Sequence, residues 1–358
     1  MPSSANDIIV LGSGVAGLTS ALTFADMGYS TTIVERKNEF GGHAVEWTCM
    51  ATVRCAKCGA CQSQELRQKA LSHPSITVEA GAELTGLEGD PGKFVAMVRT
   101  NDGEKKIPAS AVVVSTGFKP FDAKRDTMLG YGRFPGVFTI IDVDEALKAD
   151  AISNFVPADL ENPRIAFIQC VGSRNQVEKR DYCSQFCCKN TVRQSRRIKY
   201  LLPKAQITVF YIDLQVMGKE FRTFFKASQG EINYIQGAPA EVVPVEKEGP
   251  YKLFAIDPKT GDTVGHEFDR VVLAIGVDHE QGNTALAETL GVELNDRGFF
   301  KSEGNRSSRD GVYLAGACAG PTAIPSAIAH GMAAAVEVRK TFAPKNAEEK
   351  PIIIHRFA

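Results

Sequence analysis

A glycine-rich turn between a strand pattern and a helix pattern constrains the fold of this chain more than any other feature. Residues 8–11 read Ile-Ile-Val-Leu, as expected for a buried parallel strand, and lead directly into Gly-Ser-Gly-Val-Ala-Gly at 12–17. A helical pattern follows, and a second strand pattern at 31–34 ends at Glu35, 18 residues after the last glycine. Strand, glycine turn, helix, strand and acid together predict the βαβ unit of a dinucleotide-binding domain.

Each part of this unit has a physical role in binding a dinucleotide. Gly12, Gly14 and Gly17 allow a tight turn, a close approach of the backbone to a pyrophosphate and close packing of helix on strand. The amino end of the helix favours the negative phosphates. Glu35 would accept hydrogen bonds from the adenosine ribose and repel a 2′-phosphate. The competing interpretation is a turn in an ordinary α/β domain, in which strand, helix and acid are in register by coincidence.

The size and charge of the chain narrow the function classes. With 358 residues, 44% hydrophobic and 23% charged, it exceeds the usual size of one compact core, so we expect two domains or one domain split by another. A net charge of −1 gives no general attraction to nucleic acid or anionic membranes. No apolar stretch nears the roughly 18 residues that span a bilayer, and the first residues show no export signal. We therefore expect a cytoplasmic protein with no membrane span and no nucleic-acid partner.

Three further motifs indicate which nucleotide is bound. Gly-Gly stands at 41–42, Ala-Val-Val-Val-Ser-Thr-Gly at 111–117 and Asp-Gly-Val-Tyr-Leu-Ala-Gly at 310–316. At these points the chain resembles the two-dinucleotide-binding-domain flavoproteins, the superfamily of thioredoxin reductase and glutathione reductase. The resemblance implies that the glycine turn binds FAD and that the 310–316 motif covers its ribityl chain. The implied cofactor-binding residues are Gly12, Gly14, Ala16, Gly17, Glu35, Arg36, Gly42, His43, Thr116, Gly117, Gly316, Ala317 and Ile324.

One position departs from that superfamily. Its members usually have an aspartate directly after the last glycine of the 310–316 motif, where it holds a ribityl hydroxyl, and this chain has Ala317. We still expect FAD to bind, with another group making that contact.

The resemblance also implies the architecture. It is a thioredoxin-reductase-like α/β fold of two Rossmann-type dinucleotide-binding domains with β-meander insertions. The FAD-binding domain is expected at 1–130 plus 285–342, the inserted domain at 131–284 and a tail at 343–358. An internal echo supports this division, because residues 77–117 and 232–276 both read as hairpin excursions that return to a strand ending in glycine.

The inserted domain lacks the glycine turn with which such a domain would bind NAD(P)H. Its first strand pattern, at 164–169, runs into Cys-Val-Gly-Ser-Arg at 170–174. Without the glycines the backbone cannot closely approach a pyrophosphate. We therefore expect no nicotinamide site here.

Four of the nine cysteines follow that strand. Cys170, Cys183, Cys187 and Cys188 are separated by 13, 4 and 1 positions. Four thiolates suit a [4Fe–4S] cluster or zinc, and grouped cysteines in a reducing compartment more often hold metal or do redox chemistry than form structural disulfides. The competing interpretation is a set of buried structural cysteines.

The segments around these cysteines resemble one family in particular. Ile-Gln-Cys-Val-Gly-Ser-Arg at 168–174, Tyr-Cys-Ser at 182–184 and the pair at 187–188 look like the signature of the A-type subunits of heterodisulfide reductases and their relatives. Val-Phe-Tyr-Ile-Asp at 209–213, Met-Gly-Lys at 217–219 and the 316–325 region match the same family. The chain is most similar to the short form found in the heterodisulfide-reductase-like complexes of sulfur oxidisers, which lacks added ferredoxin domains.

This second resemblance implies cofactors, partners and one tuning residue. The four cysteines would hold one [4Fe–4S] cluster close to FAD. Arg193 stands where methanogenic members commonly have a lysine near the flavin N5, and a permanent charge there would favour a one-electron relay. The implied partners are a second copy in a homodimer and other iron–sulfur or thiol–disulfide subunits of a heterodisulfide-reductase-like complex.

The remaining cysteines and the basic residues allow several interpretations. Cys49, Cys55, Cys58 and Cys61 could hold a second cluster, form a dithiol–disulfide pair or lie at a partner interface, and we favour exposed thiols or a disulfide. Cys318 is expected to be a small packed residue. A basic run follows the double cysteine, and we expect a solvated helix face for all of it except Arg193; its members are Lys189, Arg193, Arg196, Arg197 and Lys199.

The predicted function is therefore that of a flavoprotein oxidoreductase within a complex, with FAD and one cluster, that transfers electrons in sulfur-compound oxidation. The alternative is an NAD(P)H-dependent FAD disulfide reductase that uses a Cys55/Cys58 dithiol. A non-catalytic cluster-bearing sensor or scaffold is a third possibility, for which the FAD site would be unnecessary.

Overall fold

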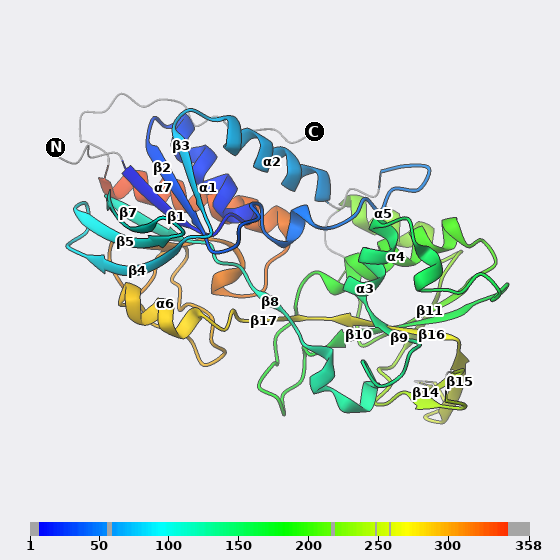
Figure 1. Cartoon of the computed structure of the whole chain (residues 1–358). Helices are drawn as coiled ribbons and strands as arrows, with labels where there is room; N and C mark the ends of the chain where they lie inside the picture. The colour runs from blue at the N-terminus through cyan, green and yellow to red at the C-terminus, as the bar shows by residue number, and fades with distance from the viewer. Residues whose placement is uncertain (1–6, 56–58, 216–218, 248, 258, 343–358) are drawn as a thin grey trace. The chain divides into compact units, whose positions relative to one another are not determined.

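The computed structural model describes residues 7–55, 59–215, 219–247, 249–257 and 259–342. Within this part the chain divides into two compact units. The first unit comprises 7–46, 59–119 and 278–342, and the second comprises 47–55 and the described residues of 120–277 (Figure 1). The expected tail at 343–358, together with Cys58 and most of the 217–219 motif, lies outside the described residues.

The first unit is built on a parallel five-stranded sheet with the strand order β18-β7-β1-β2-β3. In the central strand β1, the side chains from Ile8 to Leu11 are apolar and at most 3% exposed. They are buried because neighbouring strands and packed layers cover this strand on all sides. The strands are β1 (Asp7–Leu11), β2 (Ser30–Glu35), β3 (Ile76–Ala80), β7 (Ala111–Val114) and β18 (Val312–Leu314).

An antiparallel meander packs on this sheet. Ile9 and Leu11 of β1 share a buried core with Leu84, Phe94 and Ala96 of the meander. Its strands are β4 (Glu83–Glu88), β5 (Phe94–Thr100) and β6 (Gly103–Ala109).

The helices of the first unit include one very close pair. A Cβ on Gly331 would lie 2.5 Å from the carbonyl oxygen of Ala16, so only glycine lets the two helices approach this closely. The pair is α1 (Val15–Asp26) and α7 (Ile324–Phe342), and the other helices are α2 (Ala60–Ser72), α6 (Asn283–Leu290), η1 (His43–Val45) and η5 (Gly316–Ala319).

The second unit repeats the plan of a parallel five-stranded sheet, with the order β12-β11-β10-β16-β9. In Figure 1 helices α3, α4 and α5 cover one face of this sheet, while β14 and β15 lie on the other side. The strands are β9 (Val137–Thr139), β10 (Arg164–Val171), β11 (Gln206–Tyr211), β12 (Asn233–Gln236) and β16 (Arg270–Ile275). The helices are α3 (Ile140–Lys148), α4 (Cys187–Leu201), α5 (Lys219–Ser228), η2 (Ala123–Arg125), η3 (Thr127–Leu129) and η4 (Ile152–Asn154).

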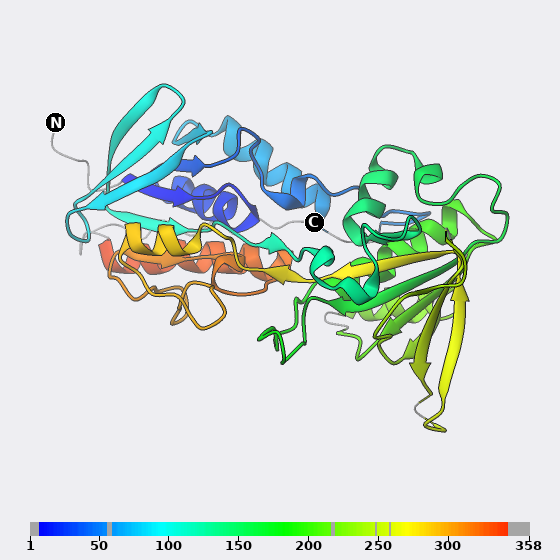
Figure 2. The same cartoon turned by 60° about the horizontal axis from the view of Figure 1, so that its bottom comes forward.

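A second antiparallel meander belongs to this unit and projects from it in Figure 2. Phe210 of β11 meets Phe268 edge to face at 5.7 Å, which fixes the meander against its own sheet. Its strands are β13 (Val243–Pro244), β14 (Tyr251–Ile256) and β15 (Thr263–Phe268). The chain passes between the units in β8 (Lys119–Pro120) and β17 (Val277–Asp278), which pair with each other.

The predicted α/β class is confirmed, with two parallel sheets that each carry a β-meander insertion. The units change at 119/120 and 277/278, and the predicted functional boundaries near 130 and 285 stay predictions. Among the helices of the described residues, none combines the length and the apolar character needed to cross a membrane.

Candidate functional site

The turn after β1 forms a cradle that only glycines can build. Gly12 has φ +95°, and a Cβ on it would lie 2.6 Å from the carbonyl oxygen of Ser115. A Cβ on Gly17 would overlap the carbonyl oxygen of Gly12. The loop is thus pressed against the end of β7 while it turns into α1, as the sequence predicts.

The middle glycine of the turn faces open space. No atom of the described residues lies within 4 Å of a Cβ placed on Gly14, whereas Gly42, with φ +66°, would put its Cβ 2.8 Å from the Gly14 Cα. Thr116 borders the same turn, with its Cα 3.0 Å from the Cβ position of Gly12. Its buried hydroxyl has no hydrogen-bond partner among the described residues. A cradle with one open glycine and one orphaned hydroxyl fits a ligand that brings phosphate or hydroxyl groups.

Three more predicted residues come from the carboxyl-terminal part of the chain. Gly316 has φ +76°, and a Cβ on it would lie 2.6 Å from the Cβ of Ala16. Ala317 follows in η5 and is buried. Ile324 begins α7 and would contact a Cβ on Gly59 at 3.2 Å. The 310–316 motif therefore returns to the glycine turn, as the resemblance implies.

The acid at the end of β2 accepts hydrogen bonds from the glycine turn and from the residues that follow β2. The backbone N–H and the hydroxyl of Ser13 donate to Glu35 Oε2 at 2.8 and 2.6 Å, and the Lys37 N–H donates to Oε1 at 2.9 Å. Ser13 occupies a variable position of the motif, so the sequence pattern gave no reason to single it out.

Three other predicted residues lie on the rim of the first unit. Arg36 is 58% exposed and pairs with Glu280 at 3.1 Å. The His43 Nε2 lies 3.1 Å from the Phe118 carbonyl oxygen. Gly117 has φ +79° and open space around its Cβ position.

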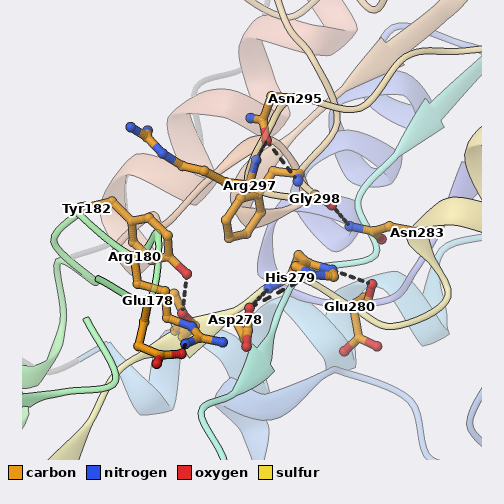
Figure 3. Close-up of polar contacts among 12 residues, drawn as sticks. Glu178, Arg180, Tyr182, Asp278, His279, Glu280, Asn283, Asn295, Arg297 and Gly298 are labelled. Carbon is orange, nitrogen blue, oxygen red and sulfur yellow. Dashed lines mark hydrogen bonds and ion pairs between the residues drawn. The ribbon is translucent and has the colours of Figure 1, made fainter. Parts of the chain in front are cut away.

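A polar network supports Glu280, the partner of Arg36 (Figure 3). The Nδ1 of His279 lies 3.1 Å from the Glu280 carbonyl oxygen, and the Asn283 side chain donates to the Gly298 carbonyl oxygen at 2.9 Å. A Cβ on Gly298 would press on the His279 ring at 2.6 Å. Sequence reasoning missed this network, since its residues match no motif.

In the second unit, a backbone irregularity places Cys170. The register of β10 shifts between Ile168 and Val171, and Cys170 has φ +63°, in the left-handed region that non-glycine residues rarely adopt. Its side chain is buried. Strand β10 therefore ends by turning Cys170 out of the alternation of the sheet.

The loop from Cys170 to α4 is tied to the residues that directly follow β16. The Tyr182 hydroxyl donates to the Val277 carbonyl oxygen at 2.9 Å, and the Val277 N–H donates to the Ser184 hydroxyl at 3.1 Å. A Cβ on Gly276 would overlap that hydroxyl and lie 3.1 Å from the Ser173 Cβ. Figure 3 shows Tyr182 beside Arg180, which an isolated bridge joins to Asn175 earlier in the loop.

The four predicted cysteine ligands lie together. Cys187 and Cys188 begin α4 and are buried, and the Cys187 thiol makes hydrogen bonds with the thiols of Cys170 and Cys188. The hydrogen bond with Cys170, neighbouring thiols and burial raise the pKa of Cys187 to about 12. Burial raises the pKa of Cys183, whose sulfur accepts a hydrogen bond from the Gln185 N–H at 3.3 Å.

The chemistry of these four side chains suits an iron–sulfur cluster, but within the described ranges no group of three or more Cys, His, Asp or Glu side chains is arranged to hold a metal ion. The expected [4Fe–4S] cluster therefore stays a prediction. All four nearby donors are sulfur, which iron–sulfur clusters prefer, and two of them stand at the amino end of a 15-residue helix, which favours negative charge.

An ion pair holds the loop beside α4. Arg174, with φ +55°, pairs with Asp213 at 2.6 Å, and its guanidinium lowers the pKa of that carboxyl group. The Cys188 thiol donates to the Asp213 carbonyl oxygen at 3.9 Å.

The basic run on α4 differs from a solvated face. Lys189 and Arg193 lie over the Phe221 ring at 5.7 and 5.2 Å, and Arg196 lies over Phe224 at 4.7 Å. Burial and the neighbouring Arg193 lower the pKa of Lys189. The expectation of a solvated face is wrong for Lys189 and Arg196, because α5 presents aromatic rings to them. The predicted location of Arg193 beside a flavin stays a prediction.

The amino-terminal cysteines divide between the units. Cys49 and Cys55 are exposed on the segment 47–55, which is anchored in the second unit. Cys61 is also exposed, and it lies in the first turn of α2, in the first unit. By contrast, Cys318 is fully buried, its thiol donates to the Val114 carbonyl oxygen at 3.1 Å, and burial raises its pKa to about 12. Cys318 is thus a packed residue, as expected.

Comparison with known proteins adds a family match. The family described as pyridine nucleotide-disulphide oxidoreductase matches residues 6–153 and 213–331. The stretch between the two matched parts contains Cys170, Cys183, Cys187 and Cys188. The segment that carries them, residues 170–188, is called the thiol loop below.

Curated relatives include the A-type subunits of heterodisulfide reductases. An A-type iron-sulfur subunit of the CoB–CoM heterodisulfide reductase of Methanopyrus kandleri is 26% identical over 96% of this chain and 66% of that protein. The corresponding subunit of the H2:CoB–CoM heterodisulfide, ferredoxin reductase of Methanothermobacter marburgensis is also 26% identical, over 96% of this chain and 65% of that protein. The chain thus spans just under two thirds of the length of these relatives, and the predicted resemblance is confirmed.

Solved structures with a similar fold include two thioredoxin reductases. That of T. acidophilum has a TM-score of 0.62 at 19% identity, covering 94% of this chain and 99% of that one. That of Lactococcus lactis has a TM-score of 0.59 at 18% identity, with the same coverage. These similarities confirm the predicted thioredoxin-reductase-like fold.

Proposed function

The chain belongs to the pyridine nucleotide-disulphide oxidoreductase family, and on that premise we propose that it is an electron-transfer subunit. It binds FAD in the first unit and one [4Fe–4S] cluster in the second, and it works within a multi-subunit complex that acts on sulfur compounds.

Membership of the family makes the chain an oxidoreductase of the flavoprotein class. Its relatives are named as A-type subunits of heterodisulfide reductases, and one is named an iron-sulfur subunit. These names support the cluster and the complex proposed for this chain.

One observation carries the proposal: the two units end their equivalent strands differently. In the first unit β1 runs into the glycine cradle of Gly12, Gly14 and Gly17, whereas in the second β10 runs into the thiol loop that begins at Cys170. A pyrophosphate needs the close backbone approach that glycines give. The second unit therefore has thiols where a pyridine-nucleotide site would stand.

The residues proposed to hold FAD are those of the cradle. The open face of Gly14 and the amino end of α1 would receive the pyrophosphate, and Glu35 the adenosine ribose. Gly42, His43, Thr116 and Gly117 would border the isoalloxazine side, and Gly316, Ala317 and Ile324 the ribityl side. Ala16, Gly17 and Gly12 shape the turn, and Arg36 lies at its rim.

The residues proposed to hold the cluster are Cys170, Cys183, Cys187 and Cys188. The N–H of Gln185, which already points at the Cys183 sulfur, would stabilise its thiolate. When bound, FAD exchanges electrons in pairs or singly and the cluster exchanges them singly. We retain Arg193 as the proposed flavin-tuning residue, on the strength of its position five residues after Cys188.

The proposed assembly is a homodimer that joins other iron–sulfur or thiol–disulfide subunits. Those partner subunits would supply the substrate chemistry.

Anaerobic purification tests the proposal. We expect about one FAD and four iron and four sulfide ions per chain, with no bleaching of NADH in the presence of small disulfides. One FAD with no iron and rapid NADH oxidation would instead indicate the Cys55/Cys58 disulfide reductase. A chain with neither cofactor would contradict both functions.

A further inference from the structure

The side chain of Ser13 connects the glycine turn to two other parts of the cradle. It stands between Gly12 and Gly14 and is fully buried. Its hydroxyl donates to Glu35 Oε2 at 2.6 Å and accepts a hydrogen bond from the Gly41 N–H at 2.9 Å. One hydroxyl thus joins the turn after β1, the acid at the end of β2 and the loop that leads to Gly42.

The hydrogen bonds leave Glu35 little freedom. A carboxylate accepts about four hydrogen bonds, two on each oxygen. On Glu35 the N–H and hydroxyl of Ser13 occupy Oε2, and the Lys37 N–H occupies one position of Oε1. Among the described residues, one acceptor position is left unfilled, and it is on Oε1.

We infer that Ser13 is a positioning residue for recognition of the adenosine ribose: it fixes Glu35 so that a single ribose hydroxyl is bound, by Oε1. This inference rests on the proposed FAD site and adds to it a residue and a geometry. Without the Ser13 hydroxyl, the Glu35 carboxylate can rotate. The carboxylate must then become ordered, and the Gly41–Gly42 loop must close, when the cofactor binds.

The same hydroxyl couples the two ends of the cradle. Its bond to the Gly41 N–H orients the loop whose next residue, Gly42, lies against Gly14. Loss of the hydroxyl leaves the Gly41 N–H in a buried place without that partner, which is costly.

The first experiment is a double-mutant cycle on FAD binding. Apoprotein of the full chain is titrated with FAD for the native chain, Ser13→Ala, Glu35→Gln and the double variant. We expect each single variant to weaken FAD binding roughly tenfold, as for loss of one hydrogen bond to a charged group. The double variant should bind no more than about twofold weaker than the weaker single variant, because the two residues act as a unit.

The matched control is Ser20→Ala. Ser20 is equally buried in α1 but donates to the Ala16 carbonyl oxygen at 2.9 Å and has no contact with Glu35. It should leave the FAD affinity within about twofold of native. Unchanged affinity in Ser13→Ala, or full additivity in the double variant, overturns the inference.

The second experiment needs no variant, so folding cannot affect it. The native apoprotein is titrated with FAD and with FAD analogues that carry 2′-deoxyadenosine or 3′-deoxyadenosine. One analogue should bind roughly tenfold weaker than FAD and the other equally well. Equal losses for both analogues, or no loss for either, contradict a single-hydroxyl contact while leaving FAD binding itself intact. If native chain binds no FAD, the proposed function and this inference both fail.

Discussion

The backbone N–H of Thr48 donates a 3.1 Å hydrogen bond to the buried carboxyl group of Asp144. This bond attaches the cysteine-bearing segment 47–55 to helix α3. Two further contacts strengthen the attachment: Trp47 stacks on Phe186 with ring centroids 6.3 Å apart, and the Arg197 side chain donates to the Ala51 carbonyl oxygen at 2.8 Å. Exposed Cys49 therefore stands on a segment that is fixed to the elements flanking the thiol loop.

The first prediction concerns the pH dependence of folding stability. Burial raises the pKa of Asp144 to about 6, whereas in an unfolded chain it is about 4. The folded state thus binds the proton of Asp144 more tightly than the unfolded state does. The contribution of this proton to the free energy of unfolding is complete below about pH 4 and is lost as the pH rises through about 6. Asp144→Asn, which keeps an oxygen acceptor for Thr48, should remove this dependence and raise the free energy of unfolding at pH 8 by about 2 kcal/mol.

Urea unfolding between pH 4.5 and 8 measures this effect. Asp159→Asn is the control, because that carboxylate is exposed in the same unit. A native stability that rises across this pH range relative to Asp144→Asn would show that the carboxylate, rather than the carboxylic acid, is the form that the fold favours.

The second prediction concerns the cradle. Gly42→Ala should weaken FAD binding by at least tenfold, since its Cβ would lie 2.8 Å from the Gly14 Cα and displace the loop. Gly28→Ala is the control: it has a similar positive φ of +89° and open space around its Cβ position. Both variants carry about 1 kcal/mol of backbone strain, so the strain alone does not separate them, and only Gly42→Ala is expected to lose FAD affinity. Equal affinities would show that Gly42 does not border the cofactor.

The third prediction concerns the thiol loop. Gly276→Ala should push away Ser184 and Ser173 and lower the iron content well below one cluster per chain, with FAD retained. Overpacking of this kind costs about 1–3 kcal/mol. The control is Gly230→Ala in the same unit, which is exposed and has nothing within 4 Å of its Cβ position. Iron analysis and the flavin spectrum of both variants measure the outcome, and full iron content in Gly276→Ala would separate the loop from the cluster.

The sequence was most informative where a feature depends on the local conformation of the backbone. The strand–glycine turn–strand pattern predicted the tight turn at Gly12, the close packing at Gly17 and the position of Glu35 at the end of β2, because each depends on few neighbours. The two meanders were equally readable from their turns. The four cysteines could be grouped because strand end and helix start bring them together.

Contacts between distant segments could not be predicted in this way. The stacking of Arg193 on Phe221, and of Trp47 on Phe186, depends on which helix packs beside α4, and no local pattern encodes that choice. Ser13 was missed for a different reason. It occupies a variable position of the glycine motif, and only the structure shows its hydroxyl turned toward Glu35.

The central claim is that the thiol loop holds a cluster independently of the flavin, and iron and flavin analysis of two cysteine variants tests it most directly. Cys187→Ala removes a thiol that contacts both Cys170 and Cys188, and Cys318→Ala removes an equally buried thiol in the first unit. The account predicts that Cys187→Ala loses its iron and keeps about one FAD per chain, while Cys318→Ala keeps both. Full iron content in anaerobically purified Cys187→Ala would contradict it.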